Sequence, residues 1–216
     1  MTPQHDPSSR AQGDSSQRFV RAARTEDVDD IVRIQVAAWR AAYGPRLPAE
    51  VLAEMTGEEA GRRFHEQWTA AIGNPPTSRH RLLVATDTEE PVGGAQGPGR
   101  VRRITVGFAA LGPGQDPDLW PATDAELYAL HVDPAHAGTG HGSRLLNAAV
   151  DHLVDDGFRT VHLWVAEEGD PLRAFVERSG WRPDGAHREV DAGGLLPMVR
   201  LHAAIAADAP PSAPPA

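Results

Sequence analysis

Residues 125–157 contain, in order, an apolar segment, a short turn, a glycine-rich loop and a helical pattern, and this order constrains the fold more than any other stretch. Residues 126–132 are rich in apolar and aromatic side chains and end at Asp133-Pro134, where proline stops sheet pairing. Beyond the loop, apolar residues recur at helical spacing: Leu145, Leu146, Ala149, Val150, Leu153 and Val154. Gly157 follows, where a left-handed helix cap is expected. The stretch therefore predicts a strand, a glycine loop and an amphipathic helix.

The loop at residues 138–142 reads GTGHG and leads into the amino end of the predicted helix. Such a loop presents several backbone N–H groups together with the positive end of the helix dipole, which suits a phosphate group. A plain connection with glycines for a tight turn is the alternative, and the loop alone favours neither. It is not a P-loop, because no lysine precedes Ser143. A dinucleotide-binding turn stays open, since residues 160–165 run into Glu167 and Glu168, but it would need a parallel sheet from the amino terminus.

The composition narrows the class of protein. The 216 residues suffice for one domain with a substantial core, and the absence of cysteine excludes disulfides, zinc–thiolate sites and a cysteine nucleophile. The formal charge of −9 argues against nucleic-acid binding as the main task. We find no apolar run long enough to span a membrane and no signal peptide, so we expect a cytoplasmic protein without a membrane partner.

We expect a single domain at residues 18–205 between two disordered tails, residues 1–17 and 206–216. A strand at residues 18–23 precedes a helix with Thr25 as its N-cap, Pro48 opens a second helix, and a third helix is expected at residues 58–72. Strands at residues 81–85, 102–110 and 126–132 follow as antiparallel hairpins, with a mobile glycine-rich loop at residues 93–100.

After the central helix, the strand at residues 160–165 should lie parallel to the strand before it, because a helix intervenes. Asp170-Pro171 is a typical helix start, and Gly180 is expected to end that short helix. A final hairpin passes through Gly193-Gly194. We see no internal repeat.

The central stretch resembles the acetyl-CoA-binding core of the GNAT superfamily of N-acetyltransferases. That family's loop reads Arg/Gln-x-x-Gly-x-Gly/Ala after a strand that ends in Val-x-Pro, and here the two glycines fall on Gly140 and Gly142. Ala137 stands at the leading Arg/Gln position, which removes one contact to pyrophosphate, and Arg144 is placed to supply some of the missing charge. The order of elements also resembles the family's α/β (α+β) fold, a mixed, mostly antiparallel sheet with flanking helices around the strand–glycine loop–helix unit.

The resemblance implies acetyl-CoA as cosubstrate, bound by Leu130, His131, Val132, Ala137, Gly138, Thr139, Gly140, His141, Gly142, Ser143 and Arg144. For the His141 side chain, a phosphate contact and a solvent-facing position are equal alternatives. Residues 39–43 and the Leu47-Pro48 that follows resemble the WRxxY feature of one common bacterial subgroup. We therefore expect the wall of the acceptor pocket to contain Trp39, Arg40 and Tyr43.

Acetyl transfer from a thioester to an amine requires a neutral amine, and lysine-type amines titrate at about 10.4, so a base must remove a proton. Glu126 is our candidate; a solvated strand-end carboxylate is the alternative. Residues 175–181 resemble the family's Phe-Tyr-Glu-x-x-Gly-Phe motif, but Val176 replaces the tyrosine that often serves as general acid. Gly169 likewise replaces an asparagine. Tyr128 shares strand parity with Glu126 and could line the cleft, or could be an ordinary packed aromatic.

The sequence thus predicts an N-acetyltransferase that moves an acetyl group from acetyl-CoA to a primary amine in a ternary complex. A CoA-binding module with weakened catalysis and, less favoured, a nucleotide-binding enzyme of another class are the alternatives. We expect a small-molecule or peptide amine as acceptor, with net acidity favouring a cationic one, and a monomer or homodimer. The ten histidines lack metal-site spacing, so no metal is expected.

Overall fold

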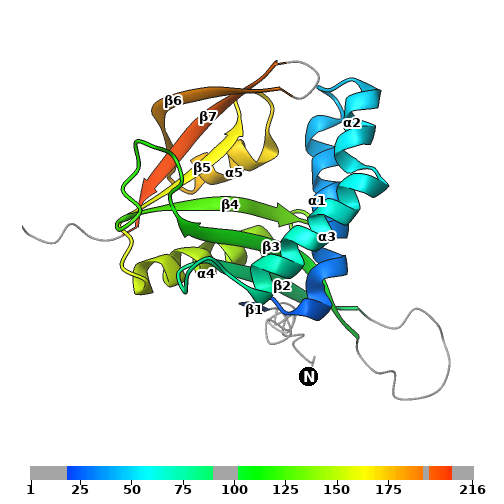
Figure 1. The fold of residues 1–216 in the computed structure, drawn as a ribbon, viewed down its shortest axis with the longest axis horizontal. Coiled ribbons are helices and arrows are strands. Elements are labelled where there is room, and N and C mark those ends of the chain that lie inside the picture. Colours follow the sequence, from blue (N-terminus) through cyan, green and yellow to red (C-terminus); the bar gives the residue numbers. More distant parts are fainter. Residues whose placement is uncertain (1–18, 90–101, 192–194, 206–216) are drawn as a thin grey trace, which may run out of the picture.

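The computed structural model describes residues 19–89, 102–191 and 195–205. The expected tails, the loop at residues 93–100 and the turn at Gly193-Gly194 lie outside these ranges. Along the chain the elements are β1 (Phe19–Ala22), α1 (Val28–Tyr43), α2 (Ala49–Thr56), α3 (Glu58–Gly73), β2 (Arg81–Glu89), β3 (Arg102–Pro113), β4 (Asp124–Val132), α4 (His141–Asp155), β5 (Thr160–Ala166), α5 (Pro171–Arg178), β6 (Arg182–Asp191) and β7 (Leu195–Ala204) (Figure 1).

One seven-stranded sheet of order β1-β2-β3-β4-β5-β7-β6 organises the molecule. Every neighbouring pair is antiparallel except β4 and β5, which are parallel as expected for strands joined through α4. The prediction of a mixed, mostly antiparallel sheet is confirmed. The dinucleotide-binding alternative is wrong, because the first four strands are antiparallel rather than parallel.

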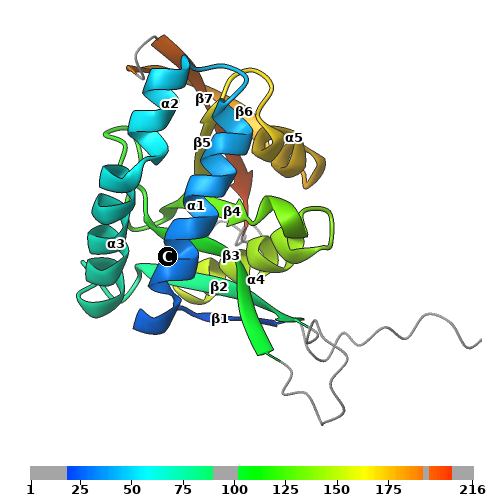
Figure 2. The same cartoon turned by 90° about the vertical axis from the view of Figure 1, so that its right-hand side faces the viewer.

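Helices cover both faces of β2–β4 (Figure 2). On one face α4 buries most of the apolar stripe predicted from the sequence against the strands, with Leu145 and Leu153 fully buried, whereas Val154 of that stripe is exposed. On the other face α1 and α3 pack Ile31, Ile34 and Trp68 against Phe108 of β3. Burial of these side chains provides most of the stabilisation of the two layers.

The β4 and β5 strands separate soon after they begin to pair. Their register covers only three residue pairs, from Asp124↔Thr160 to Glu126↔His162. Beyond Glu126, β5 continues alongside β7, whereas β4 stays with β3 and carries a bulge, since Leu127 and Ala129 face consecutive residues of β3. A bulge increases local twist, and here it accompanies the divergence that opens the sheet.

Local signals predicted most helix ends but failed at the first one. Thr25 is not an N-cap: residues Thr25–Asp27 form a short 3-10 helix, and the Asp27 carboxylate accepts a hydrogen bond from the Arg24 N–H at 2.8 Å. In contrast, Asp170 caps α5 as predicted, accepting from the Leu172 N–H at 2.8 Å. Gly157 and Gly180 both have positive φ at helix ends, 83° and 96°. Within the described residues, no helix has the length and apolar character needed to cross a membrane.

Candidate active site

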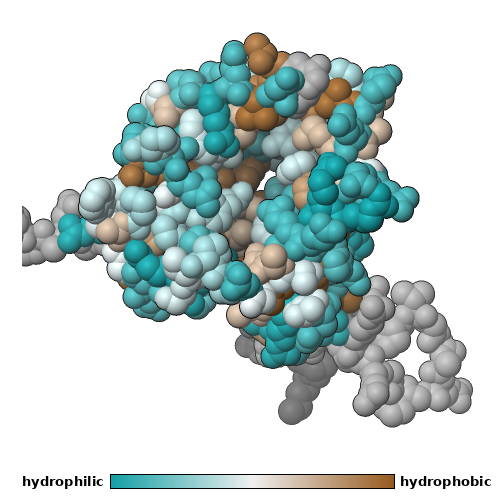
Figure 3. Space-filling model, viewed as in Figure 1, coloured by the Kyte–Doolittle hydropathy of each residue, from teal (hydrophilic) through white to brown (hydrophobic). Residues whose placement is uncertain are grey.

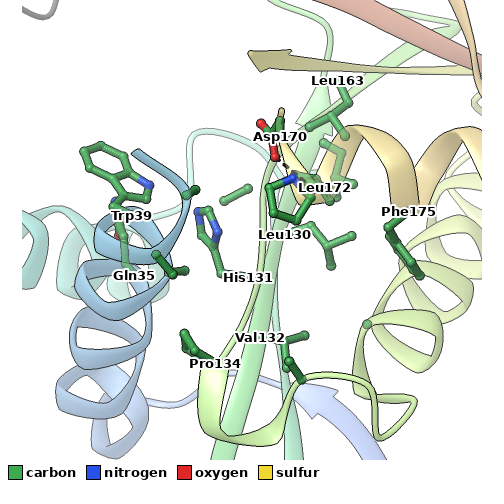
Figure 4. A pocket seen from close by; sticks show the side chains of 18 of the residues that line it. Gln35, Trp39, Leu130, His131, Val132, Pro134, Leu163, Asp170, Leu172 and Phe175 are labelled. Carbon is green, nitrogen blue, oxygen red and sulfur yellow. Dashed lines mark hydrogen bonds between the residues drawn. The ribbon is translucent and has the colours of Figure 1, made fainter. Parts of the chain in front are cut away.

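A cleft of about 1040 Å³ opens where β4 and β5 diverge. Figure 3 shows the molecule hollowed between the helices α2 and α3 and the strand side. In the close-up, Trp39 of α1 lies on one side and Phe175 of α5 on the other, with Leu130 and Val132 of β4 between them (Figure 4). We distinguish three parts: the loop end (residues 137–143), the helix wall (Trp39, Tyr43 and Phe64) and the apex, next to the point where β4 and β5 stop pairing (Glu126, Tyr128, Trp164 and Arg188).

The loop end has the geometry of an anion site. Gly138 and Gly140 adopt left-handed φ values of 75° and 87°, which glycine tolerates best. Gly140 is the N-cap of α4, so no cap side chain occupies the first N–H groups of that helix. A Cβ at Gly138 would meet no atom within 4 Å, so the loop surface is open. Backbone donors and the helix dipole therefore face an accessible space.

Side chains around the loop give it limited extra charge. Arg144 lies beside Gly140, with one guanidinium nitrogen 3.3 Å from the position of a Cβ there. Thr139 donates its hydroxyl proton to the His136 carbonyl at 2.6 Å, which stiffens the turn. Ala137 and Ser143 line the cleft without such contacts. The loop could hold a pyrophosphate mainly through its backbone.

The His141 side chain occupies neither of the two positions expected for it. It is 1% exposed, and its Nε2 atom lies 3.0 Å from Oδ2 of Asp87 on β2. The imidazole is therefore turned into the protein, and only the backbone of His141 is placed to meet a ligand. No local pattern signals this, because the partner carboxylate lies 54 positions earlier in the sequence.

The β4 backbone has one free edge along Leu130, His131 and Val132. These residues pair with Ala109, Phe108 and Gly107 of β3, while no strand within the described residues pairs with their other side. Alternate N–H and C=O groups of this edge point into the cleft, where an extended ligand could extend the sheet. Burial lowers the pKa of His131 to about 4, so its ring is neutral at physiological pH.

At the apex, Tyr128 contacts the end of β3, and Glu126 contacts the segment that connects β3 to β4. Glu126 Oε2 accepts a hydrogen bond from the Gln115 N–H at 3.2 Å, and the Tyr128 hydroxyl donates to the Pro113 carbonyl at 2.6 Å. Burial raises the pKa of Glu126 above its ordinary value, with Asp116 adding to this and the Gln115 N–H opposing it. A carboxylate that is half-buried and easier to protonate than usual is a suitable general base.

The helix wall contains two of the three residues expected there. Trp39 packs edge-on against Tyr43 and Phe64, with ring centroids 6.1 and 5.2 Å apart. Arg40 does not line the cleft. Its guanidinium donates to Thr56, at 3.0 Å to the hydroxyl and 2.8 Å to the carbonyl, and so links α1 to α2. Successive helix residues point about 100° apart, which explains why Trp39 and Arg40 separate.

The α5 helix supplies packing to the cleft. Val176 is fully buried in the core, so the position of the family's tyrosine faces away from the cleft, and Phe175 lines it instead. Burial, with help from the nearby Asp170 charge, raises the pKa of Tyr43 to about 12. Sequence reasoning missed Phe64, Trp164 and Arg188, which come from elements whose apolar pattern alone does not show which residues face the cleft. Among the described residues, no group of three or more metal-ligating side chains could hold an ion.

This combination of a split mixed sheet and an anion loop at a helix start defines the acetyltransferase class of fold. A model of the Acetyltransferase (GNAT) family matches residues 36–181. The chain therefore belongs to the GNAT family and is an acyltransferase.

Several known proteins are similar to this chain. An uncharacterized N-acetyltransferase, YuaI, from Bacillus subtilis is 28% identical over 71% of this chain and 74% of its own length. A mycothiol acetyltransferase from Propionibacterium freudenreichii is also 28% identical, over 73% of this chain but only 41% of its own length.

The solved structures below 25% identity show the fold alone. The PaiA N-acetyltransferase of Thermoplasma acidophilum, solved in complex with coenzyme A, has a TM-score of 0.59 at 16% identity and covers 87% of this chain and 98% of its own. YncA, a putative acetyltransferase from Salmonella typhimurium solved with acetyl-CoA, has a TM-score of 0.55 at 18% identity, covering 91% and 98%.

Proposed function

We propose that the protein is an N-acetyltransferase that moves the acetyl group of acetyl-CoA to a primary amine by direct attack in a ternary complex. One observation carries the proposal: a single strand, β4, has the half-buried Glu126 near its start and the open anion loop just beyond its end, and both line one cleft. The ligands named for the two structural relatives support it. We also assign the chain to the WRxxY subgroup, on residues 39–43.

In this proposal the loop end binds the pyrophosphate of acetyl-CoA through the backbone N–H groups of residues 138–142, with Arg144 adding positive charge. The free edge of Leu130, His131 and Val132 binds the pantetheine arm. Acetyl-CoA supplies an activated thioester, and a backbone N–H of the same edge stabilises the negative charge that develops on the carbonyl oxygen.

The apex and the helix wall receive the amine. Glu126 removes one proton from the ammonium form and passes it to solvent, and the nitrogen lone pair attacks the thioester carbonyl carbon. A C–N bond forms, the nitrogen loses its second proton to Glu126, and the C–S bond breaks. The sulfur leaves with its electron pair and is protonated from solvent, since a thiol titrates at about 8.5 and Val176 offers no proton. Tyr128 contributes by holding the segment that contacts Glu126, and Trp39 and Tyr43 contact the acceptor.

The acceptor is a small-molecule or peptide amine. The cytoplasmic location and the monomeric or homodimeric state expected from the sequence stay predictions, as does the expected absence of nucleic-acid and membrane partners.

Calorimetric titration of acetyl-CoA into the protein tests the loop, with Gly138→Asp as the variant and Gly157→Asp as its matched control. Both glycines have positive φ, 75° and 83°, and a Cβ at either meets no atom within 4 Å, so the backbone strain is the same. Only Gly138 lies in the loop. We expect Gly138→Asp to weaken binding at least about tenfold through charge repulsion and Gly157→Asp to leave it unchanged. Equal effects, or no binding to the unmodified protein, would contradict the proposal.

A weakened CoA-binding module is the second candidate, and the buried Val176 favours it. Thiol release from acetyl-CoA over a panel of primary amines separates the two functions. Release that depends on the added amine supports the enzyme, whereas tight binding of acetyl-CoA without release from any amine supports the module.

A further inference from the structure

Two arginines reach the apex region, and the first of them is fully neutralised. Arg200 of β7 is 5% exposed, and its guanidinium donates to Asp116 at 2.8 Å, to Asp118 at 2.9 and 2.5 Å and to Asp184 at 2.6 Å. Three carboxylates thus surround one guanidinium. Four of the five N–H donors of Arg200 are engaged by these carboxylates, and the residue joins the β3–β4 connection to β6 and β7.

The second arginine, Arg188 of β6, keeps its charge available. Its guanidinium carbon lies 4.2 Å from the ring centroid of Trp164, a cation–π contact. Within residues 19–89, 102–191 and 195–205, no carboxylate lies at ion-pair distance from Arg188, although four acidic side chains occupy the same region. A guanidinium stacked on a ring retains its in-plane N–H donors, which match a carboxylate in bidentate geometry.

The Trp164 ring is a fixed support for this guanidinium. Its Nε1–H donates to Asp116 Oδ2 at 2.8 Å, and Asp116 is held in turn by Arg200. Trp164 and Arg188 both line the cleft together with Glu126. The position of the Arg188 charge is therefore set by the cluster of Arg200 and its three carboxylates behind Trp164.

Arg188 and Glu126 interact electrostatically without forming an ion pair. The positive charge of Arg188 is one of the influences that oppose the rise in the Glu126 pKa, while the Glu126 carboxylate is bonded to the Gln115 N–H. The apex thus offers a base and a separate cation at the mouth of one pocket, next to an aromatic wall of Trp39, Tyr43 and Phe64.

We propose that the acceptor is an amine that also bears a carboxylate and a large apolar body, the chemistry of an aromatic or branched aliphatic amino acid. The carboxylate binds Arg188 on its Trp164 support, the amine faces Glu126, and the apolar body rests on the helix wall. This inference rests on the proposed acetyltransferase function. It also differs from the cationic acceptor that net charge favours, because the cation that lines the cleft beside Glu126 is Arg188.

Thiol release with matched amines tests the inference. L-phenylalanine is compared with phenethylamine, and L-leucine with 3-methylbutylamine, so that each pair differs only in the carboxylate. We expect kcat/KM for the amino acid to exceed that for the amine by about 10- to 100-fold, as a charge-assisted hydrogen-bond pair allows, mainly through KM. In Arg188→Gln this preference should fall close to unity, while Arg159→Gln, an exposed arginine outside the cleft, should keep it.

The amino acid and the amine differ in basicity, but this difference is the same for both proteins. It therefore cancels when the preference of Arg188→Gln is divided by that of the wild type. An unchanged preference in Arg188→Gln, or a wild-type preference for the amine lacking the carboxylate, overturns the inference. Calorimetric titration of L-phenylalanine into the protein saturated with CoA tests it independently of turnover: we expect binding that Arg188→Gln abolishes, and no binding to the wild type overturns the inference. No release from any amine together with intact amino-acid binding would instead contradict the proposed function alone.

Discussion

The chemistry proposed at the residue scale depends on the environment of Glu126. Burial raises the pKa of this carboxyl above its ordinary value of 4.5, and the Gln115 N–H and the charges of Arg188 and Arg200 limit the rise. A protonated Glu126 cannot accept a proton from the acceptor ammonium. The rate should therefore increase with pH as the pH passes the raised pKa.

The first prediction concerns the fall in rate at low pH, which we call the acid limb of the pH profile. Glu126→Gln should lower kcat by about 10²- to 10⁴-fold, the usual contribution of a positioned base, and should remove the acid limb seen in the wild type. Steady-state thiol release between pH 5 and 9 measures both. Glu168→Gln changes an exposed carboxylate outside the cleft and should leave the profile intact. A Glu126→Gln profile that retains the wild-type rate and limb would exclude Glu126 as the base.

Tyr128 is expected to act through Glu126 rather than on the substrate. Its hydroxyl proton is bonded to the Pro113 carbonyl, two residues before Gln115, which holds Glu126. Tyr128→Phe should cost about 1 kcal/mol of stability, shift the acid limb of the pH profile and lower kcat less than Glu126→Gln does. A loss of kcat above 10²-fold with an unshifted limb would show instead that Tyr128 itself transfers a proton.

The sequence allows prediction of some single residues and not of others. The places of Glu126 on a strand and of the loop glycines at a helix start could be predicted from local patterns, and their roles stay proposals. His141 and Arg40 could not, since each side chain is directed by a partner distant in sequence: Asp87 for His141 and Thr56 for Arg40. Whether Arg188 is free or paired likewise depends on contacts that no local pattern encodes.

At the scale of the elements, the capping of α5 controls one wall of the cleft. Asp170 accepts hydrogen bonds from the Leu172 N–H at 2.8 Å and the Ala166 N–H at 3.2 Å, so one carboxylate ends β5 and begins α5. Figure 4 shows the first of these contacts at the edge of the pocket. Loss of the cap should weaken the helix start and loosen the packing of Phe175 against the loop end.

Asp170→Ala should therefore lower the free energy of unfolding by about 1 to 2 kcal/mol, the usual cost of removing an N-cap. Urea unfolding followed by circular dichroism measures the change. Asp170→Asn keeps an acceptor oxygen and should recover most of the loss. If the asparagine variant is as unstable as the alanine variant, the charge of Asp170 matters and its capping does not.

Helices were easier to predict than strand ends. Asp170-Pro171 and Gly157 are local signals, and the helices they bound have the expected positions. β2 and β3 run on to Glu89 and Pro113, beyond their apolar cores, because a paired strand lengthens as long as its neighbour offers hydrogen bonds. The bulge in β4 between Leu127 and Ala129 depends on the pairing with β3 and has no signal in β4 alone.

At the scale of the whole molecule, the insertion of β7 between β5 and β6 completes the site. The chain order does not reveal this insertion, which brings Arg200 of β7 next to Asp184 of β6 and to Asp116 and Asp118 of the β3–β4 connection. The network fixes Trp164 and holds the strand side of the cleft together. Sequence patterns predict the strands, but only the assembled sheet shows that these four charges meet.

Arg200→Met should consequently lower the stability of the whole domain by about 3 kcal/mol at pH 7, the lower end of the range for breaking a buried ion pair. We take the lower end because one partner, Asp118, is 62% exposed. The hydrogen bond from Arg200 chiefly lowers the pKa of Asp118 to about 2, and a lowered carboxyl pKa stabilises the fold above its ordinary value of 3.8. That stabilisation disappears as the pH falls towards 2.

The difference in free energy of unfolding between wild type and Arg200→Met should therefore have its largest value at pH 7 and decrease between about pH 4 and pH 2. Urea midpoints measured across this range test the expectation, with Arg63→Met, whose only ion-pair contact in the described structure is 4.0 Å long and exposed, as the control. A difference that is independent of pH would mean that Arg200 stabilises the molecule by packing against Trp164 and not by its charge. In that case the strand side of the cleft would be held by apolar contacts alone, and Arg188 would rest on a support that does not respond to acid.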